Sequence, residues 1–384
     1  MGSRRRRIAL LVVLALLVLV AFKPTRVGLQ ALILVPSLFD APVRPLELVS
    51  TEPTLLTIPY RPDRPTDLSD LWLPSGAGPS GRVAGVVLVF GVNNPGRGHP
   101  AVVRVSRALA RTGVAVFVPD SATLTAGRLD PVEIDGVVHA FETFRARPEI
   151  DPARVGIVGF SVGGSLALLA AAQSRIAEDI SFVNAFGAYG DASGYLASVA
   201  SHAYELEGQP IPWPPSPLAR EVLTRLVIEQ LDAPGDRRLL AAILEAAAQS
   251  GGRIVADPAL DARLSASGQA VYELVTAPDL TAARTAVEGL APRTQELLDD
   301  LSPLRHLDGL RTDVYLMHEL NDFHVPFVES RQLAIELAAR GRLVRHTEFR
   351  LFTHVQPDQI DPIDAAPELW KLVWHMHAIL VETL

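Results

Sequence analysis

Between residues 83 and 186, the hydrophobic positions fall into two patterns that follow each other along the chain. Short, largely apolar runs, typical of strands buried on both faces of a parallel sheet, alternate with longer segments that have helical spacing. The predicted strands are residues 83–90, 114–118, 155–160 and 180–186, and the predicted helices are residues 101–111, 131–145 and 162–173. Strict alternation of strand and helix indicates an α/β fold with a doubly wound, mostly parallel sheet.

The same alternation returns near the C-terminus, after a segment with a different pattern. Residues 192–300 are rich in Ala and Leu, have helical spacing and contain no convincing strand, so we expect a helical cap inserted over the edge of the sheet. Strands are then predicted at residues 312–317 and 345–352, and helices at residues 328–339 and 366–383. Before the core, residues 40–81 are rich in Pro. Because proline disfavours central strands, strands at residues 49–60 and 68–73 are expected at the sheet margin.

The N-terminus has the pattern of a targeting segment. Four arginines, Arg4 to Arg7, precede 15 uncharged residues (8–22), and a second apolar patch covers residues 27–39. Such a run is long for a signal-peptide core and short for a membrane span of about 20 residues, and no Ala-x-Ala pattern follows it. We expect an uncleaved signal-anchor that holds the rest of the chain outside the cytoplasm. A cleaved export signal and a buried helix of a soluble domain are the alternatives.

These patterns divide the chain into four parts. They are a basic and hydrophobic signal-anchor (1–39), the first part of the α/β core (40–191), the helical cap (192–300) and the second part of the core (301–384).

Composition narrows the classes of function. The 384 residues are 48% hydrophobic and 20% charged, as in folded proteins. The net charge of −8, with no basic stripe outside the extreme N-terminus, gives no reason to expect a nucleic-acid partner. The absence of cysteine excludes disulfides, zinc-thiolate sites and a cysteine nucleophile.

The most informative motif is Gly159-x-Ser161-x-Gly163, between a predicted strand and a predicted helix. A serine on a sharp strand-to-helix turn has strained backbone angles and close neighbouring chain, so only residues without a Cβ fit on either side. The turn exposes the hydroxyl at the end of the sheet, and the helix N-terminus favours negative charge there. Ser161 is therefore the candidate nucleophile.

A serine hydroxyl needs a base within hydrogen-bond reach and a group that orients the base. Catalytic groups of an open parallel sheet lie just past the carboxyl ends of its strands. Two downstream residues have that position, Asp322 after the strand at 312–317 and His354 after the strand at 345–352. The order serine, acid, histidine is the one expected of this architecture. Asp191, which also follows a strand, is the alternative acid.

With these residues in place, the sequence resembles the α/β-hydrolase superfamily, and most of all its dienelactone hydrolase and prolyl-oligopeptidase-like branch. In that branch a Ser-Pro-Leu-like segment, here Ser302-Pro303-Leu304, precedes a strand, and the acid lies in His-Gly-x-x-Asp-x-x-Val-Pro. The likeness covers residues 83–191 and 302–384. The resemblance implies the triad Ser161, Asp322 and His354.

The chain departs from the family pattern at two places. Phe90-Gly91 stands where the family usually has His-Gly before the oxyanion loop, and His318-Glu319 replaces His-Gly before the acid. The first affects loop geometry more than chemistry, because backbone N–H groups form the oxyanion hole. We assign these donors to Val162 and to Val92 or Asn93.

The expected function is therefore that of a serine hydrolase that cleaves an ester of a small-molecule acyl substrate through an acyl-enzyme on Ser161. A serine peptidase or amidase of the prolyl-oligopeptidase-like kind is one alternative, and a catalytically inactive, membrane-tethered binding protein is another. No cofactor is expected. His318 and His324 flank Asp322, but neighbouring loop histidines are more often structural than metal ligands, so no metal is expected either. The sequence leaves the oligomeric state open.

Overall fold

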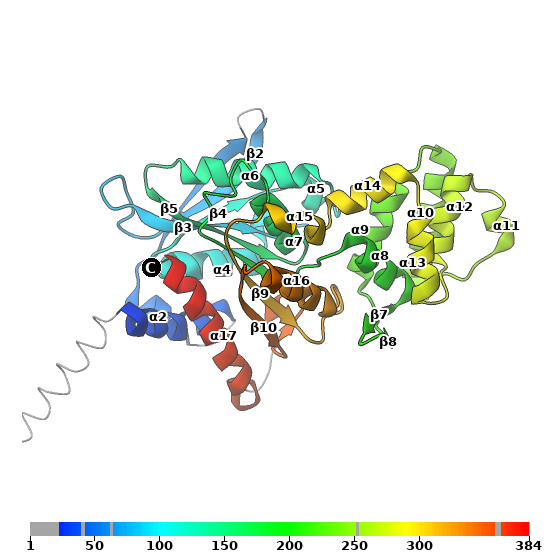
Figure 1. Cartoon of the computed structure of the whole chain (residues 1–384). Helices are drawn as coiled ribbons and strands as arrows, with labels where there is room; N and C mark the ends of the chain where they lie inside the picture. Colours follow the sequence, from blue (N-terminus) through cyan, green and yellow to red (C-terminus); the bar gives the residue numbers. More distant parts are fainter. Residues whose placement is uncertain (1–22, 40–42, 62–63, 251–252, 358–361, 384) are drawn as a thin grey trace, which may run out of the picture.

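The computed structural model describes residues 23–39, 43–61, 64–250, 253–357 and 362–383 (Figure 1). Its centre is an eight-stranded sheet with the strand order β1-β2-β4-β3-β5-β6-β9-β10. The strands are β1 (Thr54–Arg61), β2 (Arg64–Leu73), β3 (Val83–Val89), β4 (Ala115–Pro119), β5 (Ile150–Phe160), β6 (Phe182–Phe186), β9 (Asp313–Glu319) and β10 (Leu343–Phe349). Strand β2 pairs antiparallel with β1 and with β4, and the other pairs are parallel. The mostly parallel sheet and the marginal position of β1 and β2 are both as predicted.

Helices cover both faces of the sheet. One face carries α2 (Lys23–Leu38), α4 (Pro100–Arg111) and α17 (Pro362–Thr383), and the other carries α6 (Val132–Arg145), α7 (Val162–Ala171) and α16 (Val328–Ala339). Successive strand residues point to opposite faces. On β5, Ile157 packs into the hydrophobic cluster with α6 and α7, whereas Val158 packs into the cluster with α2 and α17. Burial on both faces explains the apolar strand sequences.

The last helix, α17, is held on the sheet by a buried polar contact as well as by apolar packing. The imidazole of His375, fully buried, donates from Nε2 to Oδ1 of Asn184 (2.9 Å) and accepts at Nδ1 from the Thr347 hydroxyl (2.8 Å). Burial, with the nearby positive charges of Arg345 and His346, lowers the pKa of His375 to about 3. The ring is therefore neutral at pH 7, and its two bonds set the rotation of α17 about its axis.

The cap lies at one end of the molecule, coloured green to yellow in Figure 1. Its helices are α8 (Ala192–Ser201), α9 (Pro217–Ile228), α10 (Pro234–Ser250), α11 (Pro258–Asp261), α12 (Ala266–Val275), α13 (Leu280–Glu288) and α14 (Pro292–Asp300). The prediction that it contains no strand is wrong, because β7 (Ala203–Leu206) and β8 (Gln209–Pro212) form an antiparallel hairpin. Glu207 and Gly208 both have positive φ, which suits a two-residue hairpin turn, and a two-stranded ribbon tolerates proline at its edge.

Short elements complete the chain. They are α3 (Pro45–Val49), η1 (Gly96–Gly98), α5 (Ala122–Thr125), α15 (Pro303–His306), η2 (Leu307–Gly309) and the small hairpin of β11 (Phe352–Thr353) and β12 (Gln356–Pro357). The predicted strand at 345–352 is thus shorter than expected, because the chain leaves the sheet after Phe349.

The N-terminal segment needs a correction. The predicted boundary after residue 39 cuts through one packed unit, because Val27, Ala31 and Leu34 of α2 are fully buried against the face that also carries α4 and α17. The apolar patch at 27–39 therefore belongs to the core. Across the described stretches of the chain, no helix combines the length and the apolarity needed to cross a bilayer. The hydrophobic run at 8–22 lies outside the described residues.

Candidate active site

The serine motif forms the expected turn. Strand β5 ends at Phe160, helix α7 begins at Val162, and Ser161 between them has φ 57° and ψ −136°. The flanking glycines are required by close backbone contact, since a Cβ at Gly159 would lie 2.3 Å from the carbonyl oxygen of Gly163. Strain of this kind persists only where the surrounding structure holds it, and it holds the Ser161 hydroxyl at the carboxyl end of the sheet.

A small pocket opens over Ser161. It has about 370 Å³ of empty space, part of it open to solvent, and both Val92 and Val162 line it. Val162 is the first residue of α7, so its N–H has no acceptor within the helix. Asn93 lines a neighbouring cavity instead, and its side-chain amide donates to the Gly91 carbonyl (3.1 Å). Of the predicted oxyanion residues, Val162 and Val92 therefore lie beside the serine.

Asp322 and His354 form a direct contact. Nδ1 of His354 donates to Oδ2 of Asp322 at 2.5 Å, and Oδ1 of Asp322 accepts from the backbone N–H groups of His324 (2.7 Å) and Val325 (3.1 Å). Burial alone raises the pKa of Asp322, but the charge of His354 and hydrogen bonds from His318 and His354 outweigh it and hold the pKa far below the usual value. The carboxylate is therefore ionised and fixed.

The other ring nitrogen of His354, Nε2, has no hydrogen-bond partner among the described residues. His354 is buried and has φ 58°. A Cβ added at Gly187 would lie 3.0 Å from Cε1 of His354, and the preceding residue, Phe186, accepts a hydrogen bond from the backbone N–H of Ser161 (2.7 Å). Ser161 and His354 thus both contact the end of strand β6.

No family model matches the chain, and no curated protein matches it. Among solved structures, it is similar to a puromycin-hydrolysing peptidase of Mycobacterium tuberculosis, with a TM-score of 0.52 and 16% identity over 90% of this chain and 41% of that one. The chain therefore spans less than half the length of that peptidase. A carbohydrate esterase from gut microbiota, in a truncated form, has a TM-score of 0.49 and 16% identity over 85% of this chain and 98% of that one. Dipeptidyl peptidase 4 of Porphyromonas gingivalis has a TM-score of 0.49 and 11% identity over 87% and 36%.

The sheet order, the strained serine turn and the structural likeness together decide the fold. The chain has the α/β-hydrolase fold. This is the fold that the resemblance in the sequence implies.

Within the hydrolase fold, Glu319 explains one departure from the family pattern. It is buried at the end of β9, and its Oε2 accepts from the backbone N–H groups of Leu351 (2.8 Å) and Phe352 (2.9 Å), while Oε1 accepts from Asn321 (3.1 Å). Burial raises the pKa of Glu319, and these N–H donors oppose that effect. One side chain therefore joins the loop of the acid to the loop of His354, a role that no sequence pattern indicated.

The cap of this hydrolase fold also holds the acid loop. The indole N–H of Trp213, before α9, donates to the backbone carbonyl of Asp322 (2.7 Å), and the hydroxyl of Tyr195, on α8, donates to that of His324 (2.5 Å). The backbone N–H of Ser216, the N-cap of α9, donates to the carbonyl of Phe323 (2.6 Å). Because these partners are more than 100 residues apart in the chain, sequence reasoning missed them.

The two loop histidines have structural partners. His318 is fully buried, donates from Nε2 to the Val325 carbonyl (3.0 Å) and lies 3.5 Å from Oδ2 of Asp322. His324 shares a hydrogen bond with the Ser216 hydroxyl (2.8 Å), and its ring centre is 4.6 Å from that of His354. Burial and the charge of His354 lower the pKa of His324 to about 4, so its ring is neutral at pH 7. In the part of the chain described, no cluster of three or more His, Asp or Glu is arranged to hold a metal.

The alternative acid, Asp191, has other partners. Its carboxylate caps α8 by accepting from the backbone N–H groups of Ser193 (3.2 Å) and Gly194 (3.1 Å). Behind it, the buried Glu329 accepts at Oε2 from the backbone N–H groups of Gly190 (2.9 Å) and Asp191 (3.1 Å). Burial raises the pKa of Glu329 to about 7. Both carboxylates thus fix the start of the cap, and only Asp322 contacts His354.

Glu329→Gln tests this buried carboxyl. Because the folded pKa of about 7 is above the usual 4.5, the unfolded chain ionises first, and the wild-type protein loses stability as the pH rises from about 4.5 through about 7. Glutamine does not ionise, so the variant's free energy of unfolding relative to wild type should rise by up to about 3 kcal/mol between pH 5 and pH 8. Urea unfolding of both proteins at pH 5 and pH 8 measures this difference in the free energy of unfolding. Glu336→Gln, at a half-exposed position of the same helix, is the control, and a pH-independent difference would contradict the assignment.

Trp213→Phe tests the hold of the cap on the acid loop. Phenylalanine cannot donate to the Asp322 carbonyl, and a buried hydrogen bond left unmade costs about 1–3 kcal/mol. The reaction of Ser161 with a fluorophosphonate, measured as a second-order rate constant, should therefore slow by about tenfold or more. Trp370→Phe, at an exposed position, should leave the rate unchanged. Equal rates for the two variants would show that the contact does not position the acid.

Proposed function

We propose that the protein is a serine hydrolase that cleaves carboxylic esters through an acyl-enzyme on Ser161. The observation that carries the proposal is the buried Asp322–His354 pair, in which Nε2 of His354 has no hydrogen-bond partner among the described residues, together with the strained turn at Ser161. A carboxylate that accepts from Nδ1 keeps the proton there, so Nε2 is available as the base.

In this mechanism His354 takes the Ser161 proton as Oγ attacks the ester carbonyl, and the Asp322 carboxylate stabilises the imidazolium that forms. The backbone N–H of Val162, with that of Val92 or Asn93, binds the tetrahedral oxyanion. His354 then gives the proton to the leaving alcohol. Water, deprotonated by His354, attacks the acyl-enzyme, and His354 returns that proton to Oγ of Ser161 as the acid is released. No step requires a cofactor.

The lining of the pocket supports an ester of an uncharged acyl group. Apart from Ser161, Tyr195 and the neutral His324, the described residues that line it are aliphatic: Val92, Leu129, Val162, Leu218, Ala219, Val222 and Leu223. Such a lining offers no charged partner to a peptide terminus or a charged side chain. Amide cleavage is the second candidate, because the similar structure from Mycobacterium tuberculosis is that of a puromycin-hydrolysing peptidase.

We also propose that the protein is attached to a membrane through its N-terminal residues, with the catalytic domain outside the cytoplasm. The support is the sequence of Arg4 to Arg7 followed by the uncharged run at 8–22. Release of a secreted form by cleavage is the alternative.

A fluorophosphonate probe tests the nucleophile without a choice of substrate. It should label the protein at Ser161, as located by mass spectrometry, and Ser161→Ala should abolish the labelling. Asp322→Asn should slow it by about 10⁴-fold, because the wrong tautomer of His354 is then favoured. Ser80→Ala, at an exposed turn, is the control. A folded protein that the probe does not label would instead be a binding protein with the hydrolase fold.

The acyl pocket is tested with a series of p-nitrophenyl esters. Val222 is buried on α9 and lines the pocket, so Val222→Phe should reduce kcat/KM for the butyrate at least tenfold more than for the acetate, since one or two methylenes are worth about 1–3 kcal/mol. Glu221→Gln, on the same helix but outside this pocket, should leave the ratio unchanged. Faster cleavage of peptide anilides than of any ester would favour the peptidase.

A further inference from the structure

Two of the four tryptophans lie exposed side by side on the surface of α17. Trp370 is 58% exposed and Trp374 is 47% exposed, and their ring centres are 5.9 Å apart. The other two, Trp72 and Trp213, are 7% and 5% exposed. Tryptophan is among the residues with the most apolar surface to bury, so an exposed pair one helical turn apart marks a surface that contacts something other than water.

The exposed apolar surface continues onto α2. Leu29 and Leu32 of that helix are 49% and 51% exposed, and Val381 on α17 is 39% exposed. The ring of His377 connects the two helices, because it packs against Trp374 (5.7 Å between ring centres) and donates from Nε2 to the Pro24 carbonyl (3.3 Å). We name these five apolar residues the α2–α17 face: Leu29, Leu32, Trp370, Trp374 and Val381.

The α2–α17 face is fixed in its outward direction. On the opposite side of α17, His375 is bonded to Asn184 and Thr347, and Glu382 accepts from the Tyr315 hydroxyl (2.8 Å). The buried side of α2 packs into the same core. Neither helix can therefore rotate to bury its tryptophans or leucines without breaking buried hydrogen bonds and apolar contacts.

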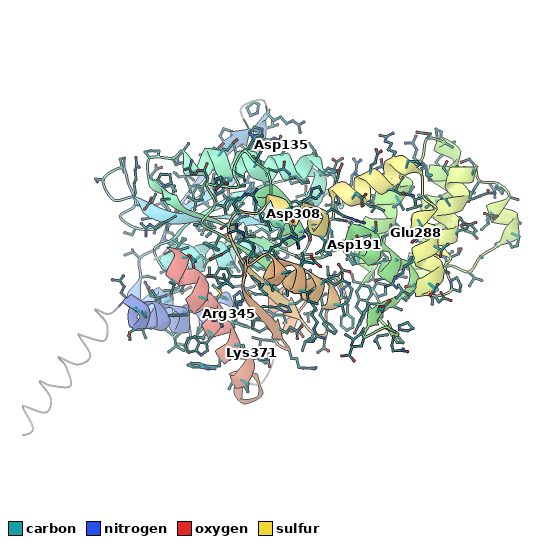
Figure 2. The ribbon with its side chains drawn as sticks, viewed as in Figure 1. Asp135, Asp191, Glu288, Asp308, Arg345 and Lys371 are labelled. Carbon is teal, nitrogen blue, oxygen red and sulfur yellow. The ribbon has the colours of Figure 1, made fainter. Side chains whose placement is uncertain are left out.

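The chain itself indicates what the face contacts. Helix α2 begins at Lys23, directly after the 15 uncharged residues at 8–22, which four arginines precede. A bilayer that holds this run lies within a few residues of Leu29 and Leu32. Indole rings concentrate at the membrane–water interface, and exposed basic residues are attracted to anionic headgroups. Arg26 on α2 and Lys371 on α17 are both exposed, although Lys371 is paired with Glu368 (2.7 Å). Figure 2 shows Lys371 and Arg345 on this side of the molecule.

We propose that the α2–α17 face lies on the surface of an anionic membrane, with Trp370 and Trp374 in the headgroup region. The inference rests on the membrane attachment proposed above and adds to it the orientation of the folded domain. The cap is at the other end of the molecule from α2 and α17 (Figure 1). Because α8 and α9 of the cap line part of the pocket, we expect substrate to reach it from the aqueous phase.

Fluorescence quenching by brominated lipid tests the orientation in the full chain. The protein is mixed with vesicles of phosphatidylcholine and phosphatidylglycerol, with and without bromine on the acyl chains, and vesicle binding is measured separately by flotation. Brominated vesicles should reduce the tryptophan emission by roughly half, because two of the four tryptophans lie on the face. The double variant W370F/W374F should still float with vesicles but lose the quenching. Trp72→Phe, at a buried position, should keep it.

The outcomes separate this proposal from the ones on which it rests. Flotation without quenching overturns the orientation and leaves membrane attachment intact. Absence of flotation overturns both, whereas the fluorophosphonate labelling of Ser161 reports on the hydrolase independently. If acrylamide fails to quench the wild-type tryptophans when no vesicles are present, then the run at 8–22 or a second copy covers the face, and the membrane orientation is wrong. Sedimentation velocity distinguishes those two occupants.

Discussion

The site depends on keeping one carboxylate ionised away from water. Asp322 is 3% exposed, and a buried charge is stable only when donors surround it. The ring of His354 and the backbone N–H groups of His324 and Val325 meet that need at its two oxygens. Each of these donors belongs to a loop. The geometry around Asp322 therefore requires that hydrogen bonds from the surrounding structure hold these loops in place.

Two separate parts of the chain hold these loops. Glu319 at the end of β9 binds the backbone that leads to His354. The cap contributes Trp213 and Tyr195, which donate to the carbonyls of Asp322 and His324. The cap is therefore more than a cover over the pocket, because removing it would free the acid loop as well as open the site. Its aliphatic helix α9 then sets the chemical character of the space beside Ser161.

The face of the sheet that carries α2, α4 and α17 has a buried polar group of its own. There, a buried neutral histidine, His375, fixes α17 so that one side of the helix is committed to the core and the other exposes two tryptophans. With α2 packed beside it, this face joins the folded domain to the N-terminal run. The molecule thus has its proposed membrane side and its cap at separate ends (Figure 1).

Local patterns were sufficient for the core strands and the serine turn, and for placing Asp322 and His354 after strands of the sheet. Apolar runs encode burial on both sides of a strand, and the spacing of glycines around Ser161 encodes a turn, so the sheet, the serine and the strand-end positions of Asp322 and His354 were all predictable. Other features depended on contacts between distant segments. The role of Glu319, the bond from Trp213 and the packing of α2 against α17 have no periodic signature, because a hydrogen bond or a buried helix face requires only that two surfaces meet. Where they meet is decided by the packing of the whole chain, and for this reason only the tertiary structure revealed what holds the acid in place.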